Sequence, residues 1–293
     1  MIFNLGSINS DLVYGLPHFP APGETLSAIN HRRGLGGKGA NQSIALARAG
    51  ATVTHIGAVG PDGAWMTDQL RCAGVECDHI QQLDCASGHA VIYVDPHGEN
   101  SIVIYPGANV ALRDNDVMVA LAQAGPDDIL VLQNETSALL SAARAAHAKG
   151  MFIAYSAAPF DAQAVRDILP YLSLLLCNEG EARQLSQALG LEVSAIPVKH
   201  LVITKGAKGA VWLDPAADPI TVPSFKVIPV DTTGAGDTFA GYLVAGLSEG
   251  KSPANAMHLA SAAAALSVTR AGAADAIPTR AEVDAFWAAQ PKE

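Results

Sequence analysis

The chain alternates short apolar runs with longer segments whose apolar positions recur at helical spacing. Residues 1–8 are predicted as a buried strand, residues 39–51 as a helix and residues 52–60 as a second strand. The same order recurs over residues 129–172, and apolar runs open "LSLLLCNEGEARQL" and "HLVITKGAKGAVWL". Short strands that are almost entirely apolar and alternate with helices favour a mostly parallel sheet covered on both faces. We therefore expect an α/β fold with a three-layer α/β/α body.

Two stretches depart from this rhythm. Residues 11–34 contain Pro/Gly turns without a helical period, and residues 89–106 are two β-rich runs joined by the hairpin signal "DPHGEN". We expect both to form a small separate β-sheet that projects from the body, and the tail from Thr279 to form a terminal helix. The predicted division assigns residues 12–36 and 87–105 to the small sheet, and residues 1–11, 37–86 and 106–293 to the body.

Composition narrows the class of protein. Of 293 residues, 49% are hydrophobic and 16% charged, which allows a large core and argues against disorder. The net charge of −10 argues against a nucleic-acid partner. Four cysteines without a CxxC pair fit free thiols in a reducing compartment. The start has no basic n-region and no long apolar stretch, so no signal peptide is expected, and the most apolar helical run, residues 258–268, is too short to cross a membrane. A cytoplasmic protein is expected.

One glycine-rich stretch, "GLGGKGANQ", contains a GxGxxG pattern at Gly34, Gly36 and Gly39. A dinucleotide-binding fingerprint would follow a buried strand, whereas the polar "NHRR" precedes this one. Because Lys38 is followed by glycine, the stretch is not a Walker A loop either. Two interpretations remain: a plain turn into a helix, or a loop whose backbone and Asn41 side chain approach a polar ligand.

The second glycine-rich stretch is "VDTTGAGDTFAG", residues 230–241. Apolar residues after it share one helical face, so a helix is predicted from about Asp237. The N–H groups of residues 234–236 would then point forward without helical partners and form an anion hole. A carboxylate at the edge of that hole suits phosphoryl transfer, in which the acceptor hydroxyl must lose a proton. The alternative is that Asp237 is an ordinary helix N-cap.

Together, "GGKGANQ" and "DTTGAGDTFAG" resemble the paired signatures of the ribokinase-like (PfkB) carbohydrate kinases, and "GSINSD", "NEGE" and "VTRAGAADAIP" extend the resemblance over nearly the whole chain. It implies an α/β body with a β-sheet lid, ATP as phosphoryl donor with Mg²⁺, and a sugar as acceptor. It also implies a homodimer formed through the lid.

The resemblance assigns site residues where the motifs match. The sugar-binding positions are Asn9, Asp11, Gly37, Lys38, Asn41 and Glu135, with Asp237 as the catalytic base and Gly234, Ala235 and Gly236 as the anion hole. The nucleotide positions are Asn178, Glu181, Thr204, Gly206, Gly209, Gly236 and Ser261, with Glu181 holding magnesium through water. A monovalent cation, usually potassium, would lie between Asp231 and Thr233 on one side and Ser267, Arg270, Gly272 and Ala276 on the other. The alternative for Asp231 is that it caps a turn.

The signatures do not choose among sugars. The lid pattern "GENSIVIYPGAN" and the "SINSD" entry favour D-ribose, which would become ribose 5-phosphate. Fructose, a sugar acid such as keto-deoxygluconate, or a nucleoside stacked on Tyr93, Tyr105 or Phe19 remain open. For a charged substrate Arg32 and Arg33 could supply a cation, although surface arginines on a lid edge are the commoner explanation. A non-catalytic sugar- or nucleotide-binding relative is the remote alternative, against which the intact Asp237 and Gly-Ala-Gly stretch argue.

Overall fold

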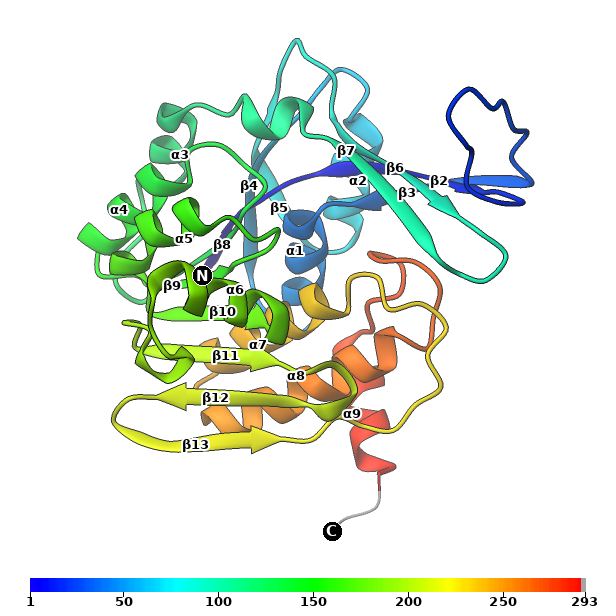
Figure 1. The fold of residues 1–293 in the computed structure, drawn as a ribbon. Coiled ribbons are helices and arrows are strands. Elements are labelled where there is room, and N and C mark those ends of the chain that lie inside the picture. Colours follow the sequence, from blue (N-terminus) through cyan, green and yellow to red (C-terminus); the bar gives the residue numbers. More distant parts are fainter. Residues whose placement is uncertain (291–293) are drawn as a thin grey trace.

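The computed structural model describes residues 1–290 and contains a nine-stranded sheet in the order β13-β12-β11-β10-β9-β8-β1-β4-β5 (Figure 1). Every pair from β11 to β5 is parallel, whereas β11–β12 and β12–β13 are antiparallel. The predicted mostly parallel sheet is therefore confirmed. Its strands are β1 (Ile2–Leu5), β4 (Val53–Val59), β5 (Glu76–Gln82), β8 (Ile129–Gln133), β9 (Phe152–Ser156), β10 (Leu174–Asn178), β11 (His200–Thr204), β12 (Ala210–Asp214) and β13 (Ala217–Val222).

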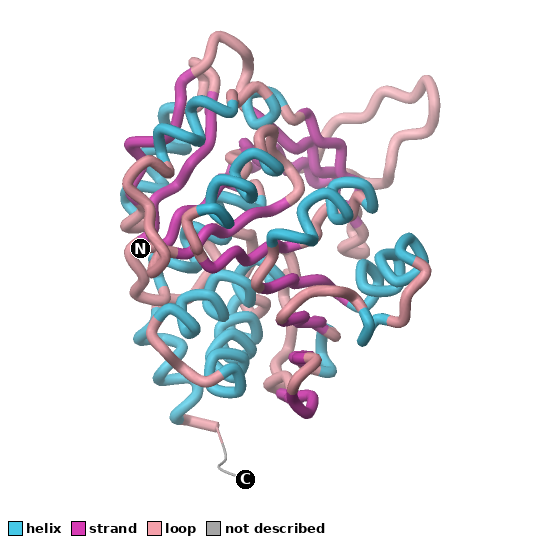
Figure 2. Tube along the Cα trace, turned by 90° about the vertical axis from the view of Figure 1, so that its left-hand side faces the viewer, coloured by secondary structure: helices cyan, strands magenta, loops and turns pink. Residues whose placement is uncertain are grey.

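Helices cover both faces of this sheet, which lies between them in Figure 2. Successive strand residues face opposite layers, as strand geometry requires: Val131 and Ala154 belong to one core, and Leu130 and Ile153 to the other. The first core is shared with α1 (Lys38–Arg48), α2 (Ala64–Cys72), α7 (Ala235–Ser248), α8 (Pro253–Ser267) and α9 (Arg280–Ala288). The second is shared with α3 (Asp114–Ala120), α4 (Leu139–Ala148), α5 (Ala162–Ile168) and α6 (Glu179–Leu189).

The two irregular stretches form a second sheet, in the order β3-β2-β6-β7, that projects to the right in Figure 1. The β2–β3 and β6–β7 pairs are antiparallel, and β2–β6 is parallel. The expected small sheet is confirmed, and with it the predicted fold class. Its strands are β2 (Asn9–Gly15), β3 (Asn30–Gly36), β6 (Gly88–Val94) and β7 (Asn100–Tyr105), so β2 begins inside the segment assigned to the body.

Glycines allow α1 to approach both the sheet and α7. A Cβ on Gly39 would lie 2.3 Å from the backbone carbon of Gly6, just after β1. A Cβ on Gly241 of α7 would lie 2.4 Å from the Cβ of Ala45 in α1. The start of α1 is thereby held at the carboxyl edge of the sheet, where open α/β sheets bind ligands. Within residues 1–290, no helix has both the length and the apolar character that crossing a bilayer requires.

Candidate active site

The loop before α7 turns through Gly234, whose φ of 72° lies in the left-handed region that glycine tolerates. The helix begins at Ala235, two residues before the predicted start near Asp237. Gly234 occupies the N-cap position, and no side chain caps the helix. Asp237 is therefore not an N-cap, and that interpretation is wrong.

The carboxylate of Asp237 is instead held by two side chains of α1. Asn41 Nδ2 donates to Asp237 Oδ2 at 3.0 Å, and Gln42 Nε2 donates to Asp237 Oδ1 at 3.0 Å. Asp237 is only 8% exposed. The two amide N–H groups hold both oxygens of the carboxylate in place. Asn41 Oδ1 is buried without a donor among the described residues, so it can accept a hydrogen bond from a ligand hydroxyl.

The first turn of α7 borders a cavity of about 190 Å³ that Lys38, Glu181 and Asp237 also line. The Ala235 N–H donates to the Thr232 carbonyl at 3.3 Å, a partner that the predicted anion hole did not include. Within residues 1–290, the Gly236 N–H finds no acceptor, and a side chain at that position would meet no atom within 4 Å. An anion can therefore reach this helix terminus closely.

Lys38 supplies the positive charge of this region. The negative charge of Asp237 is the main cause that raises the pKa of the Lys38 ammonium, and Glu135, Glu181 and Asp11 act in the same direction. An ammonium surrounded in this way stays protonated at neutral pH and can attract a polyphosphate.

Several of the predicted sugar-binding residues are held by hydrogen bonds or lie in a tight turn. The Lys38 backbone N–H donates to Glu135 Oε2 at 3.1 Å, and Ser7 Oγ donates to the same oxygen. Asn109 Nδ2 donates to Asn9 Oδ1 at 2.8 Å and fixes that amide. The turn into α1 passes through Gly37, whose φ is 91°.

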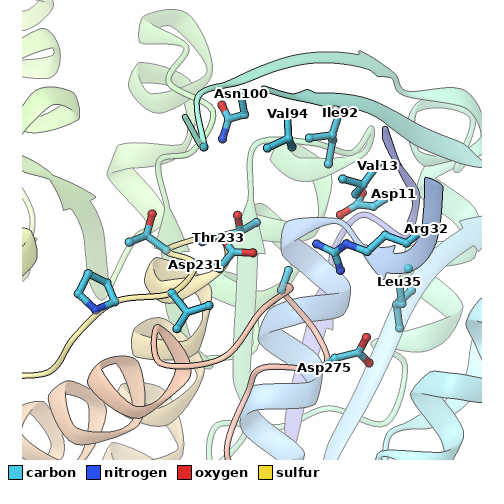
Figure 3. A pocket seen from close by; sticks show the side chains of 16 residues that line it. Asp11, Val13, Arg32, Leu35, Ile92, Val94, Asn100, Asp231, Thr233 and Asp275 are labelled. Atoms are coloured by element: carbon cyan, nitrogen blue, oxygen red, sulfur yellow. Dashed lines mark hydrogen bonds between the residues drawn. The ribbon is translucent and has the colours of Figure 1, made fainter. Parts of the chain in front are cut away.

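Asp11 lies close over the backbone of Gly36, where a Cβ would come within 2.1 Å of Asp11 Oδ2. Burial, with a smaller contribution from the negative charge of Glu135, raises the pKa of Asp11 to about 6. Asp11 and Arg32 face Asp231 and Thr233 across a cavity of about 380 Å³ between the small sheet and the body (Figure 3). Arg32 thus lines a cavity, whereas Arg33 stacks on Trp65 with its guanidinium carbon 4.1 Å from the ring centre.

A third cavity, of about 450 Å³, lies beside the first turn of α7 and is lined mainly by apolar groups. Thr204, Gly206, Gly209, Gly236 and Ser261 all line it. Ser261 Oγ donates to the Pro223 carbonyl at 3.0 Å, so this hydroxyl already has a partner.

Asn178 and Glu181 border the 190 Å³ cavity and bond each other. The Asn178 N–H donates to Glu181 Oε2 at 2.8 Å, and the Glu181 N–H donates to Asn178 Oδ1 at 2.9 Å. The pair is a capping box at the start of α6. Glu181 Oε1 takes no part in that box.

The loop at Asp231 is also held by backbone N–H groups that donate to side-chain oxygens. Asp231 Oδ1 accepts from the Thr233 N–H, and Asp231 Oδ2 from the Gly272 N–H, each at 2.9 Å. These hydrogen bonds lower the pKa of Asp231 against the opposing effect of burial, which is the largest single influence. Asp231 does cap a turn, as the alternative interpretation holds. No hydrogen bond within the described chain joins it to the other three proposed cation ligands, Ser267, Arg270 and Ala276.

Several residues that shape the site received no role from the sequence. Gln42 stands inside the quoted "GGKGANQ" motif, directly after Asn41, and Asn109 stands inside "PGAN". Their side chains bond Asp237 and Asn9, contacts between positions about 200 and 100 residues apart in the chain. Gln42 lies between the polar residues Asn41 and Ser43 in the buried part of α1, so no local signal distinguished it.

Comparisons with known proteins agree with this geometry. Residues 1–280 match the model of the pfkB family carbohydrate kinases. The chain is 39% identical to the ribokinase of Haemophilus influenzae, with 96% of each chain covered. It is 35% identical to Cryptococcus neoformans ribokinase in complex with ADP, with a TM-score of 0.86 over 97% of this chain and 98% of that one. It is 29% identical to Arabidopsis thaliana ribokinase complexed with ribose and ATP, with a TM-score of 0.85 over 97% of each chain. The chain therefore belongs to the pfkB family of carbohydrate kinases.

Proposed function

We propose that this chain transfers the γ-phosphoryl group of ATP to the primary hydroxyl of D-ribose, giving ribose 5-phosphate and ADP. The observation that carries the proposal is the placement of Asp237, whose carboxylate is held by Asn41 and Gln42 beside the open N-terminus of α7. Ribokinases are among the similar relatives, at 39% and 35% identity, and one solved ribokinase is complexed with ribose and ATP.

Each of the three cavities would hold a different part of the two substrates. The 380 Å³ cavity, with Asp11 and the small sheet, would hold the sugar, and the 450 Å³ cavity would hold the base of the nucleotide. The phosphates would then enter the 190 Å³ cavity, where the Gly236 N–H and the Lys38 ammonium face them. Closure of the small sheet as a lid would exclude water and limit ATP hydrolysis.

In the proposed reaction the sugar hydroxyl attacks the γ-phosphorus in line, and Asp237 receives the hydroxyl proton. The new bond joins the sugar oxygen to phosphorus, and the bond from phosphorus to the β,γ-bridging oxygen breaks, so ADP leaves. Asn41 Oδ1 would orient a second hydroxyl of the sugar. The N-terminus of α7 and Lys38 stabilise the charge that is spread over the transferred oxygens.

The residues present fit the two metal ions that the family implies. Magnesium needs only one or two protein carboxylates when phosphates and water supply the remaining ligands, and Glu181 lines the phosphate cavity. Among residues 1–290, no cluster of three or more His, Cys, Asp or Glu side chains could hold a metal alone, which agrees with an ion carried by ATP. Asp231, kept ionised by its hydrogen bonds, would hold potassium beside the loop. When bound, these ions would neutralise phosphate charge and order the loop.

A coupled assay of ADP release tests this function. With ATP, magnesium and potassium, we expect strong turnover on ribose and much weaker turnover on fructose, keto-deoxygluconate and adenosine. Replacing potassium by sodium should lower the rate on ribose. Turnover on another panel member alone would retain the kinase and reject the sugar assignment, whereas no turnover on any member would favour a non-catalytic relative.

We also propose that the chain acts in the cytoplasm as a dimer formed through the small sheet. Strand β7 lies at an edge of that sheet, and Ile102, Val103, Ile104 and Tyr105 are about half exposed there. An exposed apolar edge strand of this kind is a ready site for pairing with a second chain. A monomeric mass in light scattering at micromolar concentration would reject the dimer.

Replacing Asp11 by Asn should separate stability from sugar binding. Because the folded pKa of Asp11 is about 6 and the ordinary value is 3.8, its contribution to stability is complete below pH 3.8 and is lost as pH rises through 6. Asn does not titrate. The stability of the variant relative to the parent should therefore increase by about 1–3 kcal/mol between pH 4 and pH 7, measured by urea unfolding. The KM for ribose should rise at least about tenfold because two hydroxyl contacts to a carboxylate are lost.

A further inference from the structure

Behind Asp237 runs a line of five buried polar side chains, which we call the amide network: Gln42, Gln133, Asn4, Ser43 and His55. Each is at most 1% exposed, and they come from α1, β8, β1 and β4. Such a run through the junction of a sheet and a helix layer is costly unless its members satisfy one another. Its position next to the proposed base suggests a role beyond packing.

The environment of His55, at the end of the network away from Asp237, determines which group donates and which accepts in every hydrogen bond of the network. His55 Nε2 lies 3.1 Å from the Gly6 carbonyl, which can only accept, so this nitrogen carries the proton. Complete burial lowers the pKa of His55 to about 4, and at neutral pH the ring has one proton. His55 Nδ1 must then accept from Ser43 Oγ, 2.8 Å away.

The remaining bonds follow in order. Ser43 Oγ accepts from Asn4 Nδ2, Asn4 Oδ1 accepts from Gln133 Nε2, and Gln133 Nε2 also donates to Gln42 Oε1, each at 2.8 Å. Gln42 is left with only its Nε2 to face Asp237 Oδ1. If the Gln42 amide turned over, an oxygen would face the carboxylate and two amide nitrogens would face each other.

The hydrogen-bond direction of the network has a free-energy cost, which falls on Gln133. Its Nε2 serves two acceptors, while its Oε1 is buried without a donor among the described residues. That oxygen lies over the close contact of Gly6 with Gly39, where no donor is available. An unsatisfied buried oxygen lowers stability. The fold accepts this cost at Gln133 Oε1, and in this orientation the Gln133 amide donates to both Asn4 and Gln42.

We propose that Gln42 is a positioning residue for the phosphoryl transfer, held by the amide network so that Asp237 keeps one carboxylate orientation. The proposal rests on the proposed function, in which Asp237 is the base. Asn41 fixes Oδ2, and Gln42 fixes Oδ1. Gln42 borders the 190 Å³ cavity beside Asp237 but does not line the sugar cavity, and Gln133 lines none of the three cavities. Their effect should therefore appear in kcat rather than in the KM for ribose.

The test uses steady-state kinetics of Gln42→Met and Gln133→Met, which keep the volume and remove the hydrogen bonds. We expect Gln42→Met to lower kcat about 10- to 100-fold, the effect of losing one bond to a charged group, with the KM for ribose within about twofold. Gln133→Met should lower kcat less. The double variant should be no slower than Gln42→Met, because Gln133 acts through Gln42. Gln42→Met should not slow Asp237→Asn further.

Ser173→Ala is the control, because it removes a hydrogen bond to the Ile153 N–H at the opposite end of the sheet and should leave kcat unchanged. Unchanged kcat in Gln42→Met, or multiplied losses in the double variant, would overturn the proposal. If Gln42→Met does not fold, the near-isosteric Gln42→Glu places an oxygen against Asp237 and should lose at least as much kcat; normal kcat would again overturn it. Normal turnover in Asp237→Asn would instead reject the proposed function.

Discussion

Asp237→Asn is expected to lower kcat for ribose phosphorylation by about 10²- to 10⁴-fold, the usual contribution of a general base. The substitution is nearly isosteric, so the amides of Asn41 and Gln42 keep a partner of the same shape. The affinity for ribose should stay within a few-fold of the parent, because in the proposed binding mode Asp11 and Asn9 carry the sugar contacts. Coupled ADP release gives kcat, and calorimetric titration of ribose gives the affinity.

The two readouts separate catalysis from binding. If kcat falls while ribose still binds, Asp237 acts on the reacting hydroxyl. Loss of ribose binding with normal kcat at saturation would mean that Asp237 is only a substrate contact. Normal values for both would remove Asp237 from the mechanism, and with it the role proposed for Gln42.

Gly39→Ala should produce the largest loss of stability among substitutions at the site. A Cβ at this position would lie 2.3–2.4 Å from backbone atoms of Gly6 and Ser7, which cannot move aside as a flexible side chain would. Helix α1 would have to shift away from β1, and Asn41 and Gln42 would move with it. We expect a loss of about 3 kcal/mol or more in urea unfolding, and kcat should fall as well.

Gly34→Ala is the matched control for that experiment. Gly34 belongs to the same glycine-rich stretch, its φ is not in the left-handed region, and an added Cβ would meet no atom within 4 Å. Its unfolding free energy should stay within about 0.5 kcal/mol of the parent. Equal stability of Gly39→Ala and the parent would show that α1 is not held by the contact of Gly39 with Gly6.

The sequence predicted the layers well because period and composition report directly on local structure. The apolar run at residues 129–132 and the helical spacing after it predicted β8 and α4, and "DPHGEN" predicted the β6–β7 hairpin. The start of α7 was placed two residues late because apolar spacing does not register Gly234, whose positive φ sets the true beginning. Local signals therefore predicted the elements but not every boundary.

The amide network could not be predicted, because its members are distant in the chain. Asn4, Gln42 and Gln133 meet only after β1 and β8 pair and α1 packs over them. Asn4 is a lone polar residue in an apolar segment, whereas Gln42 and Gln133 stand beside other polar residues, and neither pattern names a partner. The raised pKa of Asp11 could not be predicted either, because the burial of Asp11 depends on how the small sheet folds over the body.

The most direct test of the account is to identify the product formed from ATP and D-ribose. We predict a single sugar phosphomonoester whose phosphorus couples to the two C5 protons in ³¹P–¹H NMR, formed one for one with ADP and almost absent with Asp237→Asn. A phosphoryl group on another carbon would contradict the placement of the primary hydroxyl against Asp237. Ribose as the substrate would be contradicted if no sugar ester formed and ADP arose only by hydrolysis. It would also be contradicted if ADP formed only when a nucleoside was supplied as the acceptor.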